Sequence, residues 1–150
     1  MAVRRRRVPT VLDTNVLVAA FLSRNPKSAN AAVYRMWTER RLQLILSDEI
    51  EAEYLEVLAE VGASTAHLGS LAQRLATRAT VTRVRPARSI PLSRDASDNM
   101  FLAAAATGNT RFLVTNDNDL LQIPPARMRY LRFRIVPPRD FLDLVSKGGP

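Results

Sequence analysis

Two aspartates stand just after apolar runs, where a parallel sheet would bring their side chains together. Asp13 follows the run at residues 8–12, and Asp117 comes two residues after the run at residues 112–115. Short apolar runs indicate buried strands, and in open parallel sheets ligands bind beyond the carboxyl ends of the strands. If the two strands are neighbours, we expect both carboxylates to face the same crevice.

A third aspartate, Asp98, lies near the start of an alanine-rich helix that we expect over residues 95–108. Apolar residues stand three, four and seven positions after it, so Asp98 shares the helix stripe that would face the sheet. An unpaired carboxylate on a buried stripe is costly. The pattern therefore predicts that some group pairs with Asp98.

A fourth acid comes from the helix expected over residues 48–61. Glu51 and Glu53 both lie near the edges of its apolar arc, on opposite sides. The helical period alone does not choose between them.

Each acid also has a purely structural explanation. Asp13 and Asp117 could cap the helices that follow them. Asp95 and Asp98 could form a capping box, and Glu53 could be one solvated charge on an acidic face. Capping does not require carboxylates at two strand ends together with one on a buried stripe, so their joint occurrence favours a functional site.

The acids together predict metal-assisted phosphodiester hydrolysis. Carboxylates crowded into one crevice repel each other and take up protons, and bound Mg²⁺, which prefers oxygen ligands, removes that cost. A bound divalent metal also activates water for attack on a phosphodiester. The chain has no cysteine, one histidine and no convincing Ser–His–Asp set, so few other nucleophiles are available.

Strands and helices are expected to alternate along the chain. The strands are expected at residues 8–12, 42–46, 81–84, 112–115 and 133–136. The helices are expected at 16–22, 28–40, 47–61, 64–80, 95–108 and 138–145, with a further short helix that begins at 116–119. Such alternation predicts an α/β fold with a parallel sheet covered on both faces. We expect one domain over residues 1–150, with a basic tail at 1–7, a linker-like loop at 86–91 and a frayed end at 146–150.

The composition is strongly basic. Lys and Arg number 22 against 14 acidic residues, which gives a net charge of +8. A coding bias toward arginine would explain this, and so would a polyanionic partner such as nucleic acid. The absence of cysteine excludes disulfides, thiolate catalysis and cysteine-ligated zinc. No apolar run is long enough to span a bilayer and none resembles a signal peptide, so we expect a cytoplasmic protein without membrane contact.

The sequence resembles the PIN-domain family in five motifs that cover most of the chain. Residues 11–18, with Asp13, resemble the opening motif of PIN domains. Residues 47–58 resemble the second motif, in which the glutamate before an aromatic or leucine residue is a ligand. This resemblance selects Glu53 over Glu51.

The remaining three motifs follow in the family's order. Residues 94–102 are similar to the third motif, whose second aspartate, Asp98, is the ligand. Residues 114–121 resemble the fourth motif, where the aspartate two after a threonine, Asp117, lies at the site. Residues 135–142 resemble the closing strand and helix.

The resemblance implies a three-layer α/β/α fold with sheet order 3-2-1-4-5. It also implies Mg²⁺ or Mn²⁺ held by four ligands, which are Asp13, Glu53, Asp98 and Asp117. The nearest group is the VapC-like toxins of bacterial toxin–antitoxin pairs, which implies an RNA substrate, a homodimer and a small antitoxin partner. One departure is Asn116, where this group usually has glycine. Because Asn tolerates left-handed backbone, we expect little effect.

Residues beside the predicted ligands have two possible roles. Asn15 and Thr115 could orient carboxylates or water, or could make local turn and cap bonds. Asp119 is either a peripheral acid or a helix-start residue, and the second is favoured. His67 is expected on the surface, and Trp37 in the core or at a dimer interface.

Other functions remain open from the sequence. A PIN-fold nuclease could act in housekeeping RNA processing instead of as a toxin, and a non-catalytic module could bind RNA without cleaving it. A phosphatase with an aspartate nucleophile on a similar sheet would need a second Asp two residues after Asp13. Asn15 occupies that position and argues against this alternative.

Overall fold

The strands form one parallel sheet. The computed structural model describes residues 7–87 and 96–147, and in these ranges five strands pair in the order β3-β2-β1-β4-β5. All four pairings are parallel. This confirms the predicted order 3-2-1-4-5. The strands are β1 (Val8–Leu12), β2 (Leu42–Leu46), β3 (Val81–Arg83), β4 (Phe112–Val114) and β5 (Arg134–Val136).

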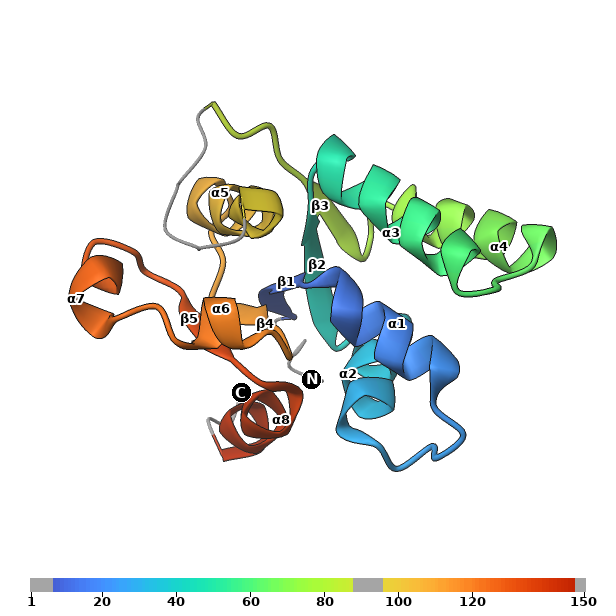
Figure 1. Ribbon diagram of the computed structural model, residues 1–150, viewed down its shortest axis with the longest axis horizontal. Helices are drawn as coiled ribbons and strands as arrows, with labels where there is room; N and C mark the ends of the chain where they lie inside the picture. The colour runs from blue at the N-terminus through green and yellow to red at the C-terminus, as the bar shows by residue number, and fades with distance from the viewer. Residues whose placement is uncertain (1–6, 88–95, 148–150) are drawn as a thin grey trace, which may run out of the picture.

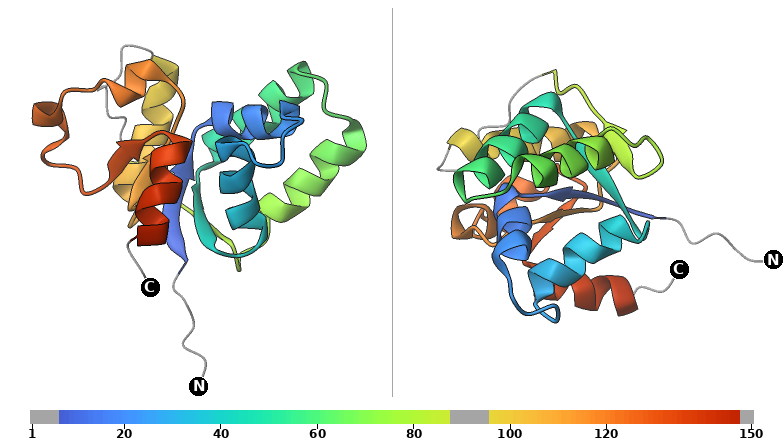
Figure 2. Two further views of the ribbon diagram at one scale, coloured as in Figure 1. Left: turned by 90° about the horizontal axis from the view of Figure 1, so that it is seen from below. Right: turned by 90° about the vertical axis from the view of Figure 1, so that its right-hand side faces the viewer.

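Helices cover both faces of this sheet, which confirms the three-layer arrangement. In Figures 1 and 2, α3, α4 and α5 lie on one face, and α2 and α8 lie on the other. Helix α1 contacts both α2 and α3. The helices are α1 (Thr14–Leu22), α2 (Ala29–Thr38), α3 (Asp48–Glu60), α4 (Thr65–Leu75), the 3-10 turn η1 (Ala96–Asp98), α5 (Asn99–Thr107), α6 (Asn118–Leu121), α7 (Pro125–Met128) and α8 (Pro138–Lys147).

The core lies on both sides of the central strands. In β1, Val11 and Leu12 are fully buried, and in β4 so are Leu113 and Val114. Strands covered on both faces carry near-continuous apolar runs, which is why these runs were visible in the sequence. Trp37 is buried as expected, and its indole Nε1 donates to the carbonyl of Thr80 at 3.3 Å.

The predicted helix over residues 64–80 was too long. Helix α4 ends at Leu75, and residues 76–80 form turns instead. The carbonyl of Thr80 accepts from Leu44 N as well as from Trp37, so the chain must already have turned toward β2 there. These contacts between distant residues override the local helical pattern.

Several other boundaries differ from expectation. Helix α7 was not expected from the sequence; Pro125 occupies its first turn, a position that proline tolerates. Helix α1 begins at Thr14, directly after Asp13, and not at Val16. The side chain of Arg7, placed in the basic tail from the sequence, donates to the carbonyls of Arg40 and Ala79.

Some expectations fall outside the described residues. They are most of the basic tail, most of the loop at 86–91, the cap at Asp95 and the last residues of the chain. No helix in the described part of the chain has the length and hydropathy to cross a membrane.

The N-terminus of α3, the helix that carries Glu53, depends on one side chain. The Ser47 hydroxyl accepts from Ile50 N at 3.3 Å and is buried. We expect Ser47→Ala to lower the free energy of unfolding by about 1 kcal/mol, because an unsatisfied helix N–H remains. Urea denaturation would measure this, and Ser70→Ala, at an exposed position inside α4, is the control. Equal stability of the two variants would contradict a capping role.

Candidate metal centre

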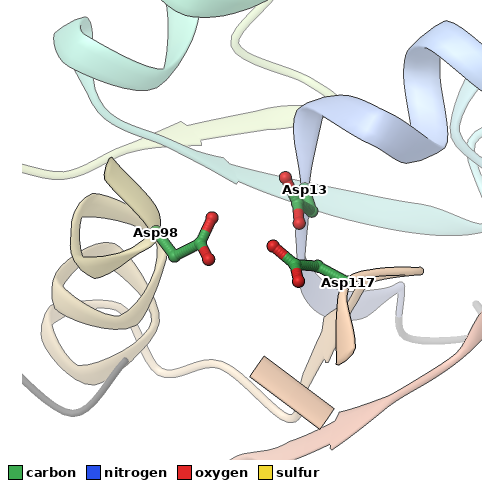
Figure 3. Close-up of side chains that lie close together, drawn as sticks. All are labelled: Asp13, Asp98 and Asp117. Atoms are coloured by element: carbon green, nitrogen blue, oxygen red, sulfur yellow. The ribbon is translucent and has the colours of Figure 1, made fainter. Parts of the chain in front are cut away.

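Three aspartates converge at the carboxyl edge of the sheet. One carboxylate oxygen from each of Asp13, Asp98 and Asp117 lies within 4.8 Å of the other two. Figure 3 shows the three side chains pointing toward one another from separate elements. Asp13 joins β1 to α1, Asp98 ends η1 at the start of α5, and Asp117 precedes α6.

The sheet register explains the approach of two of these acids. Leu12 of β1 is paired with Val114 of β4, and Asp13 N donates to the Val114 carbonyl at 2.9 Å. The strands therefore end side by side, as the sequence predicted if they were neighbours. Asp98 is buried where α5 begins, as its place on an apolar stripe indicated.

Helix capping accounts for only one of the three acids. All three occupy N-cap positions, yet neither Asp13 nor Asp98 makes a side-chain capping bond. Asp117 does, since its Oδ1 accepts from Asp119 N at 2.9 Å. Asp119 itself is exposed in the first turn of α6, where a helix-start residue was expected.

Two neighbouring side chains fix the orientation of Asp13. The Thr115 hydroxyl donates to Asp13 Oδ2 at 2.6 Å, and Asn15 Nδ2 donates to the same oxygen at 3.0 Å. The Thr115 hydroxyl also accepts from Asp117 N at 2.9 Å. The Thr115 hydroxyl therefore links the side chain of Asp13 to the backbone of Asp117, so it does more than make a local turn bond.

The cluster is electrostatically unfavourable without a cation. The pKa of Asp13 is raised from its usual 3.8 to about 6, mainly by burial and also by the charges of Asp117 and Glu53. The hydroxyl of Thr115 and the backbone of Asn15, which hydrogen-bond to the carboxylate, oppose this rise. Neither Asp13 nor Asp117 forms an ion pair with a residue that the structure describes. A bound cation would remove this cost.

The donor set fits a hard divalent ion. Mg²⁺ binds carboxylate oxygens at about 2.1 Å, so two of its ligand oxygens lie roughly 3 to 4 Å apart. The three aspartate oxygens, within 4.8 Å of one another, need only small side-chain adjustments to reach this spacing. Sulfur and imidazole ligands, which softer metals prefer, do not occur in this cluster.

Glu53 lies beside this cluster but is not one of its three converging members. It is half-buried on α3, and the Thr14 hydroxyl donates to its carboxylate. Its charge contributes to the raised pKa of Asp13. Glu51 instead pairs with Arg83 at 2.7 Å, on the other side of the helix arc.

Tyr54 supports the backbone under the site. Its side chain is fully buried, and its hydroxyl donates to the carbonyl of Leu12, the residue before Asp13. Burial, with the nearby charges of Asp13 and Glu53, raises its pKa well above the usual value, so the phenol stays protonated as a donor.

The structure also adds residues to which the sequence assigned no role. Thr14 is one, through its bond to Glu53. Asn116 is another: its N donates to Asn15 Oδ1 at 3.1 Å, and its Nδ2 donates to Asn30 Oδ1 at 2.8 Å. Among the described non-glycine residues, only Arg40 has a positive φ, so Asn116 does not need the left-handed backbone that glycine would permit. The only sequence feature that pointed to Asn116 was its departure from the glycine usual in the family motif.

Loss of the Thr115 hydroxyl is expected to weaken cation binding. Thr115 is fully buried, so Thr115→Val keeps the shape but removes one of the two bonds to Asp13 Oδ2 and leaves Asp117 N without its acceptor. Removing a group that orients a metal ligand costs roughly 10- to 100-fold in affinity. Mn²⁺ titration calorimetry would measure this, with Thr115→Ser, which keeps the hydroxyl, as the control. Equal affinity for Mn²⁺ in both variants would show that the hydroxyl does not position the site.

Comparison with known proteins identifies the family. The PIN domain family profile matches residues 9–119, which include β1 to β4 and all three clustered aspartates. No curated protein sequence matches the chain significantly. The match covers more than half of the 150 residues. On the evidence of this match and of its sheet order, the chain belongs to the PIN domain family.

Proposed function

We propose that this protein is an endoribonuclease that hydrolyses RNA phosphodiester bonds with Mg²⁺ or Mn²⁺. The observation that carries the proposal is the convergence of Asp13, Asp98 and Asp117 at the carboxyl edge of the sheet. PIN domains are generally metal-dependent nucleases, and the acidic cluster occupies the place where open parallel sheets bind ligands. The net charge of +8 favours a polyanionic substrate.

Each residue of the site has a proposed role. Asp13, Asp98 and Asp117 hold the cation. Glu53 completes the acidic set from α3, and the hydrogen bond from the Thr14 hydroxyl positions its carboxylate. Thr115 and Asn15 orient the Asp13 carboxylate. When bound, a divalent cation lowers the pKa of a coordinated water and stabilises negative charge on the phosphate. Asp119 serves the start of α6 and not the cation.

A cleavage assay tests this function. Purified protein would be incubated with a pool of single-stranded RNAs, and with DNAs of the same sequences, in Mg²⁺, Mn²⁺ or EDTA. We expect RNA cleavage in either metal and none in EDTA. Asp117→Asn should lower the rate by at least about 100-fold, more than the loss of an outer-shell partner costs. Asp143→Asn, at an exposed position on α8, is the matched control.

The outcomes separate this function from its alternatives. RNA binding without cleavage in either metal would support a non-catalytic binding module. Cleavage of DNA at the same rate as RNA would contradict the ribonuclease assignment. Release of phosphate from small monoesters, without RNA cleavage, would support a phosphatase.

We further propose a role as the toxin of a toxin–antitoxin pair, acting as a homodimer that a small antitoxin protein inhibits. The support is the resemblance of the five sequence motifs to VapC-like toxins. Expression in a bacterial host should arrest growth, and Asp13→Asn should not. Normal growth with an active enzyme would instead favour a housekeeping RNA-processing role. Sedimentation equilibrium of the purified protein would test the dimer.

A further inference from the structure

An arginine-rich segment leaves the sheet between α6 and β5. Residues 122–133, here called the arginine arm, carry Arg127, Arg129 and Arg132. Between residues 120 and 139 the chain has five arginines and no acidic residue. Figures 1 and 2 show α7, which belongs to the arm, as the outermost element on the β5 side of the molecule.

Apolar side chains hold the arm in place. Ile123 at its start and Phe133 at its end are 8% and 5% exposed, and Met128 and Leu131 pack against the core from between them. This packing fixes the backbone and leaves the three arginines exposed. None of these arginines forms an ion pair with a residue that the structure describes. Their charges are therefore available to a partner.

The arm also presents an aromatic ring to solvent. Tyr130 is 81% exposed, and the Arg129 guanidinium carbon lies 4.8 Å from the centre of its ring. Arg129 Nη2 also donates to the Tyr130 hydroxyl at 2.9 Å. The guanidinium lies over one face of the ring, and the high exposure of Tyr130 leaves ring surface on which a flat group can stack. Single-strand binding proteins combine such aromatic rings, on which bases stack, with cations that contact the backbone phosphates.

The arm connects to the acidic cluster. It begins five residues after Asp117, at the carboxyl edge of the sheet, and leads into Arg134 at the start of β5. Because β5 is parallel to β4, the start of β5 lies at the opposite edge. The arm therefore runs along the β5 flank from one edge to the other. A nucleic acid strand with one phosphate at the three aspartates can continue along this flank.

We propose that the arginine arm is a binding surface for single-stranded RNA, with phosphates on Arg127, Arg129 and Arg132 and a base stacked on Tyr130. This inference rests on the proposed function, because it names where the substrate of that site is held. Stacking on one ring tolerates any base, so the arm gives affinity and direction and not sequence specificity.

Binding of a fluorescently labelled 12-nucleotide single-stranded RNA in EDTA tests the phosphate contacts without cleavage. The triple variant Arg127→Gln, Arg129→Gln and Arg132→Gln should bind about 10- to 100-fold more weakly near 0.1 M salt. Its plot of log affinity against log salt concentration should be shallower by about 2, because each phosphate contact on a single strand contributes about 0.7. The control triple Arg40→Gln, Arg41→Gln and Arg78→Gln removes the same charge from exposed positions in the turns before β2 and before β3. It should bind within about twofold of wild type.

The aromatic contact has its own test. Tyr130→Ala should weaken RNA binding about 5- to 100-fold, the range for loss of one stacked base. Tyr130→Phe keeps the ring and loses only the hydroxyl, so it should bind within about twofold of wild type. Because Tyr130 is largely exposed, circular dichroism should show unchanged folding in both variants.

Several results would overturn the proposal. These are wild-type affinity in the arm triple, an equal loss in the control triple, or a change of oligomeric state with Tyr130→Ala at unchanged RNA affinity, which would make the arm a protein interface. Failure of the nuclease proposal can be distinguished from failure of this one. If the protein binds RNA through the arm but does not cleave it, the nuclease proposal is wrong and the arm is still an RNA-binding surface. Mn²⁺ affinity should be the same in all arm variants, since the arm contributes none of the three clustered aspartates.

Discussion

Asp13→Asn is expected to abolish metal-dependent RNA cleavage while making the metal-free protein more stable. The variant loses a charged ligand, so the cleavage rate should fall by at least about 100-fold. Its amide oxygen can still accept from Thr115 and Asn15, so the local structure is kept. Removing the buried charge relieves a cost of about 3 kcal/mol at pH 8, since the pKa of Asp13 is raised from 3.8 to about 6 and each pKa unit is about 1.4 kcal/mol.

Opposite changes in activity and stability are the diagnostic feature of this prediction. Cleavage would be measured in Mn²⁺, and the free energy of unfolding by urea denaturation in EDTA at pH 8. Asp143→Asn, at an exposed position on α8, should change neither quantity. If Asp13→Asn destabilised the metal-free protein, Asp13 would be a structural hydrogen-bonding residue. It would not be a cation ligand whose buried charge destabilises the metal-free fold.

The second prediction concerns pH. In EDTA the contribution of Asp13 to the free energy of unfolding should fall by about 3 kcal/mol as the pH rises from about 3 to about 7, because Asp13 ionises in this range. The unfolded chain releases this proton near pH 3.8, whereas burial makes the folded protein retain it until about pH 6. The folded state therefore binds more protons in this window, so its stability declines with rising pH and is constant above it.

The contribution of Asp13 is isolated by difference. Urea denaturation of wild type and Asp13→Asn would be compared at pH 4, 5, 6 and 7, because other acids titrate equally in both. The two stabilities should be similar at pH 4 and diverge in favour of the variant by pH 6. Mn²⁺ above pH 6 should raise the stability of wild type alone, because it binds the ionised folded site. A gap that is constant with pH would contradict a raised pKa for Asp13.

The sequence predicted the parts of this molecule that depend on local pattern or on family motifs. The central strands were visible because burial on both faces leaves continuous apolar runs, as at Val11 and Leu12. The order of the sheet came from the resemblance. The approach of Asp13 and Asp117 followed once their strands were assumed to be neighbours.

Features that depend on contacts between distant residues could not be predicted. The end of α4 at Leu75 is set by the bonds of Thr80 to β2 and Trp37, which lie far away in the sequence. The bond from Thr14 to Glu53 spans 39 residues, and periodicity had left Glu53 and Glu51 equivalent. The arginine arm gave no helical or strand pattern. Which of its side chains remain exposed depends on how its apolar residues pack against the core, and the sequence does not show this packing.

The most direct test of the central claim is a Mn²⁺ titration of wild type, Asp98→Asn, Asp117→Asn and the control Asp143→Asn. If the three converging aspartates hold one cation together, wild type and the control should bind Mn²⁺ with the same affinity. Asp98→Asn and Asp117→Asn should each bind at least about 10-fold more weakly. Wild-type affinity in either of these variants would contradict the assignment of that residue as a ligand, and absence of Mn²⁺ binding to the wild-type protein would contradict the metal centre itself.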